Sequence, residues 1–111
     1  MTFVDKASIT VRDPYVQGWF MFDYSVPQTA PNGSHYLSAK MLWSFDCGLR
    51  QLFPRQAVYY ASNRGAGTSV HSFAPPFEET KEHMQDVVPE TYGEHMIDYA
   101  CQNAPKPKAA P

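Results

Sequence analysis

The chain has 111 residues, 43% of them hydrophobic and 14% aromatic, and its formal net charge is −2. This length gives room for a single domain with one hydrophobic core, expected over residues 1–103. The charge gives no sign of the basic surface that binds nucleic acid. No apolar run approaches the roughly 20 residues that span a bilayer. The composition therefore predicts one globular domain that neither binds nucleic acid nor spans a membrane.

Strand-like segments fill the first two thirds of the chain. Short extended pieces at 3–4 and 9–11 precede a clear strand over 17–24, whose aromatic side chains divide between two faces. A loop is expected over 26–34, because this segment collects two prolines and an Asn-Gly pair. Further strands are expected over 36–47, 51–62 and 68–73, joined by turns at 48–50 and 63–67.

Two features refine this prediction. In the strand over 36–47, alternate residues from Leu37 to Phe45 are apolar, while the residues between them are mixed, which is typical of a strand with one face in water. Pro54 lies inside the next strand and lacks a backbone N–H, so it predicts a sheet edge or a bulge.

A change of period follows residue 77. The polar stretch 78–85 is expected to form a helical turn or a loop. Thr91 and Glu94 have the spacing of a capping box, in which each side chain bonds the other residue's backbone N–H. A short helix is expected from there to Cys101, with an apolar face made of Met96, Ile97, Ala100 and Cys101. The tail over 104–111 is rich in Pro, Ala and Lys and is expected to be a disordered spacer.

These elements predict an α+β fold, in which an antiparallel meander of about six strands carries a C-terminal helix on one face. The segment around that helix contains Glu-His-Met twice, at 82–84 and 94–96, each copy followed by an aspartate. A duplicated metal or haem site would explain the repeat. Solvated helix residues explain it better, because Met96 lies on the apolar face and Pro89 separates the copies. His83 and His95 therefore remain secondary candidates for metal or haem binding.

Other side chains are candidates for binding. Trp19, Trp43, Tyr59 and Tyr60 could form an aromatic surface for a partner, although core and cross-strand packing is their commoner use. His71, in the last predicted strand, could contact a ligand and is more often an exposed strand residue. No Ser/His/Asp set has a recognisable catalytic spacing, so an enzyme is not predicted, and neither is a cofactor.

The two cysteines, Cys47 and Cys101, form no CxxC motif, which leaves one long-range disulfide or two free thiols. Neither is placed like a nucleophile: Cys47 follows an aspartate, and Cys101 ends a helix, where the dipole does not stabilise a thiolate. A bridge between them would join the central strand to the helix and indicate an oxidising compartment. The first residues do not read as a signal peptide, which fits either a cytoplasmic protein or one whose leader has been removed.

Several segments, in order, resemble the bacterial surface-adhesin protein E family. The opening Phe3 to Ile9, the strand Trp19 to Tyr24 with Pro27-Gln28, and Ser38-Ala39-Lys40 with Phe45-Asp46-Cys47 are similar to the family's first strands. Tyr59-Tyr60, the Gly65/Gly67 turn and the ending Val88 to Thr91 with Tyr99-Ala100-Cys101 also resemble the family pattern. The chain departs from it at Glu90, where the family usually has Gly. The resemblance covers nearly all of residues 3–101.

The resemblance implies an exported envelope protein, with about six antiparallel strands, a helix on the concave side of the sheet and a Cys47–Cys101 disulfide. It also implies a periplasmic or outer-membrane location. We therefore expect a non-enzymatic envelope module that binds a protein partner, such as a host matrix protein. The alternatives are an accessory subunit of an envelope complex, with self-pairing into a homodimer, and a haem or small-ligand carrier using His71, His83 or His95.

Overall fold

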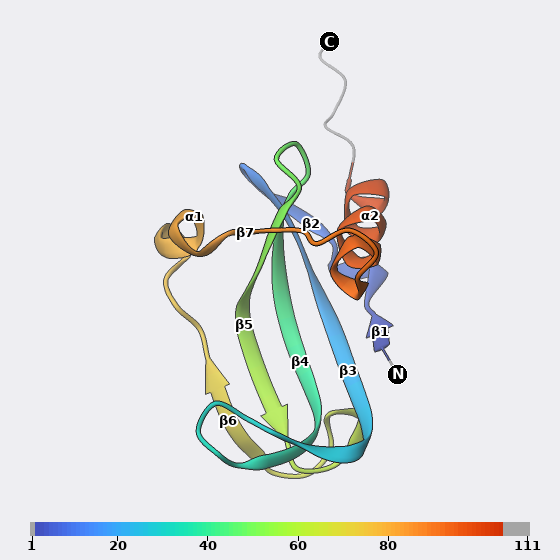
Figure 1. The fold of residues 1–111 in the computed structure, drawn as a ribbon, viewed down its shortest axis with the longest axis vertical. Helices are drawn as coiled ribbons and strands as arrows, with labels where there is room; N and C mark the ends of the chain where they lie inside the picture. Colours follow the sequence, from blue (N-terminus) through green and yellow to red (C-terminus); the bar gives the residue numbers. More distant parts are fainter. Residues whose placement is uncertain (1, 106–111) are drawn as a thin grey trace.

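The computed structural model describes residues 2–105, so the predicted tail lies outside the described residues from residue 106 on. A seven-stranded antiparallel sheet has the order β1-β3-β4-β5-β6, with β2 also paired to β3 and β7 to β5 (Figure 1). Its strands are β1 (Thr2–Val4), β2 (Thr10–Arg12), β3 (Tyr15–Thr29), β4 (His35–Asp46), β5 (Gln51–Tyr60), β6 (Ser69–Phe73) and β7 (Gln85–Asp86). The helices are α1 (Thr80–His83) and α2 (Tyr92–Asn103), with single 3₁₀ turns η1 (Lys6–Ser8), η2 (Asn63–Gly65) and η3 (Phe77–Glu79). The predicted α+β class is confirmed.

Strand β3 is longer than predicted. It continues to Thr29, and the loop expected from residue 26 shrinks to residues 30–34. The register between β3 and β4 is interrupted between Asp23 and Gln28. Pro27 lies inside that interruption, where its missing N–H removes no ladder hydrogen bond. The proline therefore marks an irregularity within a strand rather than its end.

The irregularity predicted at Pro54 is confirmed as a bulge in β5. Leu42 pairs with Gln56, and the next residue, Trp43, pairs with Pro54. Arg55 is the extra residue, with no partner on β4. A bulge of this kind redirects side chains locally, so alternation along β5 does not continue through this point.

The face of the sheet that carries α2, here called the helix face, holds two buried clusters. The first joins Phe20 and Phe45 to the helix residues Met96, Ile97 and Ala100, all at most 3% exposed. The second lies further along the strands and consists of Ala30, Ala39, Ala57 and Tyr59. The predicted apolar face of α2 is thus the one that packs.

The other side of the sheet, here called the opposite face, is less open to water than the alternation in β4 predicted. Ser38 and Ser44 are fully buried, and Leu42 is 6% exposed. For Ser38 the cause is the turn around η2, which folds against this face: its hydroxyl donates to the Ser62 carbonyl at 2.6 Å and accepts the Gly65 N–H at 2.8 Å.

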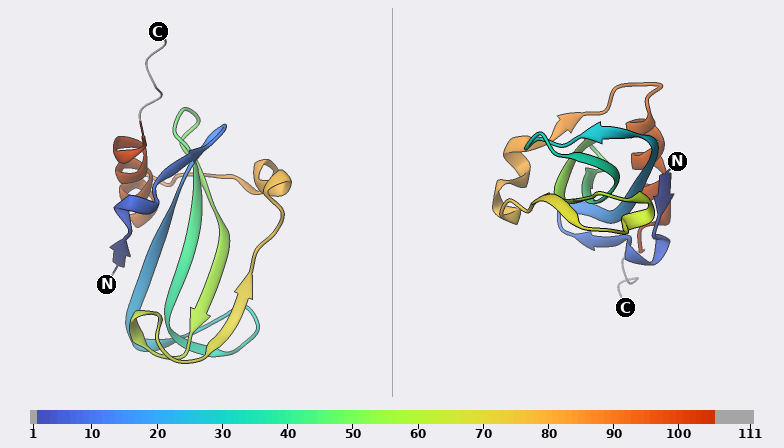
Figure 2. Two further views of the ribbon diagram at one scale, coloured as in Figure 1. Left: turned by 180° about the vertical axis from the view of Figure 1, so that it is seen from behind. Right: turned by 90° about the horizontal axis from the view of Figure 1, so that it is seen from below.

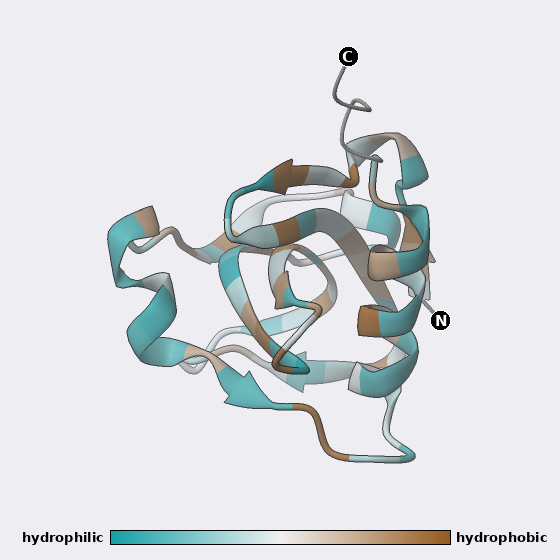
Figure 3. Cartoon of the chain, turned by 90° about the horizontal axis from the view of Figure 1, so that it is seen from above, coloured by the Kyte–Doolittle hydropathy of each residue, from teal (hydrophilic) through white to brown (hydrophobic). Residues whose placement is uncertain are grey.

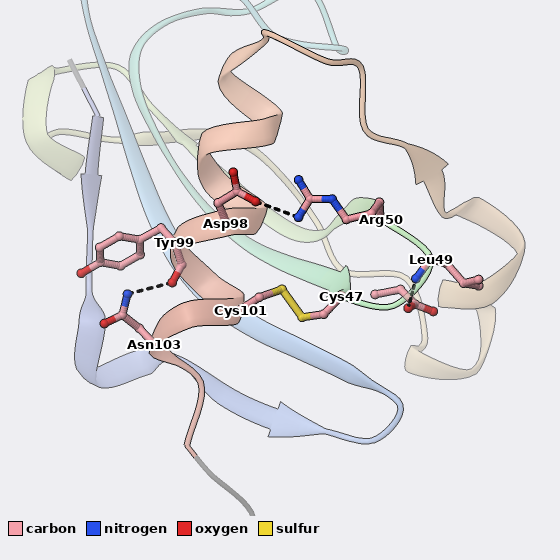
Figure 4. Close-up of a disulfide and its surroundings, with 8 residues drawn as sticks. Cys47, Leu49, Arg50, Asp98, Tyr99, Cys101 and Asn103 are labelled. Carbon is pink, nitrogen blue, oxygen red and sulfur yellow. Dashed lines mark hydrogen bonds and ion pairs between the residues drawn. A yellow bond between two sulfur atoms is a disulfide. The ribbon is translucent and has the colours of Figure 1, made fainter.

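A disulfide between Cys47 and Cys101 joins the β4–β5 turn to α2, with a Cα–Cα distance of 6.0 Å (Figure 4). Beside it, the Arg50 guanidinium pairs with the Asp98 carboxylate at 2.7 Å. The Arg50 carbonyl also accepts the Val87 N–H from the segment leading into the helix. The predicted bridge is confirmed, and one short turn holds the helix by a covalent, an ionic and a backbone link.

The predicted capping box does not form. Thr91 is the N-cap residue of α2, but its side chain makes no capping hydrogen bond. The hydroxyl instead donates to the Val88 carbonyl at 2.6 Å, and the Glu94 N–H is accepted by the backbone carbonyl of Thr91 at 3.1 Å. The hydroxyl turns toward Val88 because the preceding segment folds back on the helix start, with Glu90 at a φ of +64°.

At the end of the sheet away from the disulfide, the strands curl so that the β3–β4 loop crosses toward β6 (Figure 2). The Asn32 amide donates to the Val70 carbonyl at 2.9 Å and fixes this crossing. Helix α1 is largely hydrophilic and lies toward the β5–β6 edge of the sheet, away from α2 (Figures 1 and 3). Within residues 2–105, no helix is long and apolar enough to cross a bilayer.

Candidate binding surface

The structure divides the four aromatic residues considered from the sequence between the two faces of the sheet. Tyr59 is 7% exposed and belongs to the second buried cluster. Trp43 packs on the first cluster and stacks on Phe45, with ring centroids 6.4 Å apart. Trp19 and Tyr60 lie on the opposite face and are half-buried. Only these last two share a solvent-facing surface.

Strand register explains which residues join them there. Met21 pairs with Lys40, and Lys40 pairs with Val58 on the next strand, so these three form one row across the opposite face. Trp19 and Tyr60 lie two residues along their strands from that row, so their side chains point to the same side. We call the set Phe3, Trp19, Met21, Lys40 and Tyr60 the Trp19 patch.

A cleft of about 420 Å³ lies within this patch. It is lined by Phe3, Val4, Asp5, Trp19, Phe20, Met21 and Lys40. The cleft forms because β1 is short: it pairs with β3 over three residues, and the chain then turns at η1, which leaves space beside Trp19. Its walls are mainly apolar, and its two charged lining residues are Asp5 and Lys40. This combination of an apolar floor and a few polar groups is common in binding sites.

Lys40 is held over the patch by its neighbours. Its ammonium lies 5.7 Å from the centroid of the Tyr60 ring, within the range of a cation–π interaction. Gly65 approaches its side chain so closely that a Cβ there would lie 2.6 Å from Lys40 Cε. Gly65 also has a φ of +71°, which glycine adopts without strain. Gly65 therefore allows the η2 turn to lie directly against the lysine.

The η2 turn is fixed from the neighbouring strand by Asp23. The Asp23 carboxylate accepts the Asn63 side-chain amide at 2.8 Å and the Arg64 backbone N–H at 2.9 Å. These two hydrogen bonds, in that order of importance, lower the pKa of Asp23 below its ordinary value. The η2 turn lies against the Lys40 side chain. By fixing this turn, Asp23 helps to position Lys40 at one border of the patch.

The candidate histidines lie on three different elements. His71 is on β6, where its ring lies 5.6 Å from that of Tyr59. His83 ends α1 and stacks on Phe53 at 5.2 Å. His95 is on α2 and lines a separate pocket of about 170 Å³, smaller than the usual small-molecule site. The described part of the chain contains no group of three or more His, Cys, Asp or Glu side chains placed to hold a metal.

Aromatic packing on the helix face accounts for the tyrosines there. Tyr36 contacts both Tyr24 and Tyr59 edge to face, at 5.8 and 4.7 Å between centroids. Burial is the main cause that raises the pKa of all three tyrosines, so they remain protonated at neutral pH. These rings pack against one another as part of the structure, with Tyr59 buried and Tyr24 and Tyr36 partly buried.

Sequence reasoning missed Phe3, Met21 and Lys40 as members of the binding surface. The signal was present in part, since alternation along the predicted strand over 17–24 directs Met21 to the same side as Trp19. What the sequence lacked was the pairing of Met21 with Lys40 and of Phe3 with Met21, which brings three separate segments together. Register between strands is set by the whole sheet and cannot be read from one strand.

The fold and this surface define a class: a small, disulfide-linked α+β domain with a mainly apolar cleft on one face of its sheet. Three crystal structures have the same fold, all of protein E from Haemophilus influenzae. Crystal form II gives a TM-score of 0.65 at 19% identity, covering 92% of this chain and 80% of that one. A second structure of protein E gives a TM-score of 0.63 at 18% identity, and the match covers 92% of this chain and 77% of that one. The crystal structure of protein E from a non-typeable strain gives a TM-score of 0.59 at 17% identity, and the match covers 91% of this chain and 69% of that one.

The family follows from the sequence itself. The family described as surface-adhesin protein E matches residues 1–102, and the chain belongs to this family. Membership in a family described as surface adhesins indicates an exported cell-surface protein. None of the curated proteins is significantly similar to the chain in sequence.

Proposed function

We propose that this chain is a non-enzymatic envelope module that binds a protein partner through the Trp19 patch. The observation that carries this proposal is the cleft of about 420 Å³ beside Trp19, whose lining combines aromatic and apolar residues with Lys40. Residues that dominate protein–protein binding are enriched in Trp and Tyr and cluster in pockets from which water is excluded. Phe3 at the border of the cleft is 37% exposed, so apolar surface is available to a partner.

The proposal is tested by binding to a panel of immobilised extracellular-matrix and plasma proteins, measured by surface plasmon resonance. We expect saturable binding to at least one of them, weakened at least about tenfold by Trp19→Ala and by Lys40→Glu. Val88→Ala is the matched control, since Val88 is 62% exposed and lies outside the patch. Equal binding by all of these variants would remove the patch from the proposal.

We place the module on the outer surface of the cell rather than in the periplasm, since a partner from the host is accessible only there. The support is membership in a family of surface adhesins. Protease treatment of intact cells tests the location. Cleavage of the protein in intact cells supports the outer surface. Protection that ends only when the outer membrane is permeabilised supports the periplasm.

An accessory subunit of an envelope assembly is the second candidate, and one observation favours it. Strand β6 ends the sheet, with β5 its one neighbour in the sheet order of the described residues. Such an edge offers unpaired backbone groups to a strand from another protein or from a second copy of this chain. Light scattering across a dilution series tests self-pairing, and co-purification of a defined complex from the native envelope tests the accessory role.

A haem or small-ligand carrier is the least favoured candidate, because His71, His83 and His95 lie on separate elements. Haem titration followed by absorbance tests it directly. A Soret shift that is lost in His71→Ala, His83→Ala or His95→Ala would support a carrier, and the absence of any shift would exclude it.

A further inference from the structure

Two arginines from distant parts of the chain meet at one aromatic ring. Arg12 ends β2, Arg55 is the bulge residue of β5, and Phe77 begins η3. The Arg12 guanidinium carbon lies 3.8 Å from the centroid of the Phe77 ring, and that of Arg55 lies 5.7 Å from the same centroid. Tyr15 packs edge-on against Phe77 at 6.0 Å and supports it from β3. Four elements therefore build this site.

Arg55 is buried, which is uncommon for a charged side chain. Only 6% of its surface is exposed, and its Nε is buried without a hydrogen-bond partner in the described chain. Burial, and secondarily the charge of Arg12, lower the pKa of Arg55. An arginine nevertheless keeps its proton at neutral pH. The cost of burying the Arg55 charge and its unpaired Nε–H is therefore not removed by deprotonation, and another group must offset it.

Among the residues that the structure describes, no carboxylate forms an ion pair with Arg12 or Arg55 within 4.0 Å. Among residues 2–105 the one ion pair within 4.0 Å joins Arg50 and Asp98, at the disulfide-bonded end of α2. The Phe77 ring offsets part of the cost through cation–π contacts with Arg12 and Arg55. It accepts no hydrogen bond in the plane of either guanidinium, so donors of both arginines remain free to bind another group.

We infer that Arg12 and Arg55, which meet at the Phe77 ring, form an oxyanion-binding site. Guanidinium groups bind carboxylate, sulfate and phosphate oxygens through paired N–H donors. Two such groups at one ring suit an oxyanion better than a neutral ligand, because the anion offsets their like charges. The site is distinct from the Trp19 patch, since none of its residues lines that cleft.

The test uses the intact protein and inorganic sulfate, inorganic phosphate and acetate as probes. The Nε–H resonances of the arginines are followed by NMR while each anion replaces chloride at constant ionic strength. We expect the Arg55 resonance to shift saturably with at least one probe. A saturable shift with sulfate or phosphate but not with acetate would indicate that the site binds a tetrahedral oxyanion. A saturable shift with acetate would indicate that it binds a carboxylate, such as an acidic side chain. A resonance that does not shift, or shifts without saturation for all three anions, would overturn the inference.

Arg12→Gln is the decisive variant, because Arg12 is exposed and its loss spares the buried residues. We expect it to weaken binding at least about tenfold, as removal of one charged hydrogen-bond donor does. Lys6→Gln is the matched control, since it removes one exposed positive charge outside the site. Equal weakening by both variants would mean that only net charge matters and would also overturn the site.

Discussion

The helix face and the opposite face of the sheet come from the same strands, yet they differ in what covers their side chains. On the helix face, Phe45 and Ile97 are fully buried, and a disulfide holds the covering helix in place. On the opposite face, Trp19 and Tyr60 are partly exposed, and Trp19 lines a cleft. A strand directs successive side chains to opposite sides, so alternate residues of one strand can serve stability and, in the proposed function, binding.

The largest test of this comparison removes the link that holds the helix. The double variant Cys47→Ser/Cys101→Ser should lose about 4 kcal/mol of unfolding free energy, since the bridge closes a long loop. Urea denaturation of the variant and the oxidised wild type measures the difference. Reduction of the wild type should reproduce the loss. A variant as stable as the wild type would show that packing alone holds α2.

The next test opens a cavity on the helix face. Ile97→Ala should cost about 3 kcal/mol, because Ile97 is fully buried at the centre of the first cluster. Leu49→Ala is the control: Leu49 is 68% exposed, so its loss should change stability by less than about 0.5 kcal/mol. Thermal and urea unfolding measure both. Similar losses in the two variants would contradict the assignment of the core to this face.

The opposite face should tolerate truncation far better. Lys40→Ala should lower the unfolding free energy by less than about 1 kcal/mol, because its side chain is exposed. Trp19→Ala should cost less than Ile97→Ala, because Trp19 is partly exposed and Ile97 is fully buried. The same urea titrations measure this. A loss in Trp19→Ala as large as in Ile97→Ala would mean that the patch is part of the core and would weaken its assignment to binding.

The smallest test concerns pH and the border of the patch. The pKa of Asp23 is lower in the folded protein than its ordinary value of 3.8, so its carboxylate stabilises the η2 turn above that pH. This contribution should be lost as the pH falls below about 3.8 and passes through the lower folded-state pKa. The protection factor of the Arg64 N–H, which compares its exchange rate with the intrinsic rate at the same pH, should fall over that range. In Asp23→Asn the protection factor should no longer change over that range, and a profile like that of the wild type would contradict the role of the carboxylate.

Much of the fold could be predicted from the sequence because local patterns carry it. Alternation located the central strands, and three-and-four spacing located Met96, Ile97 and Ala100 on the buried face of α2. Pro54 marked a bulge, since a missing N–H has the same consequence in any sheet. The capping box failed because its pattern does not record where Val88 lies, and the Thr91 hydroxyl donates there instead.

By itself, the sequence determined the strand segments, the C-terminal helix and, through its resemblance to a family, the Cys47–Cys101 bridge. Each depends on neighbours in the chain or on a short ordered pattern. Only the tertiary structure decided that Trp19 and Lys40 share a cleft, that Tyr59 is buried, and that Arg12 and Arg55 meet at Phe77. The reason is physical: these contacts depend on strand register, a bulge and the crossing of distant segments, which are properties of the whole sheet.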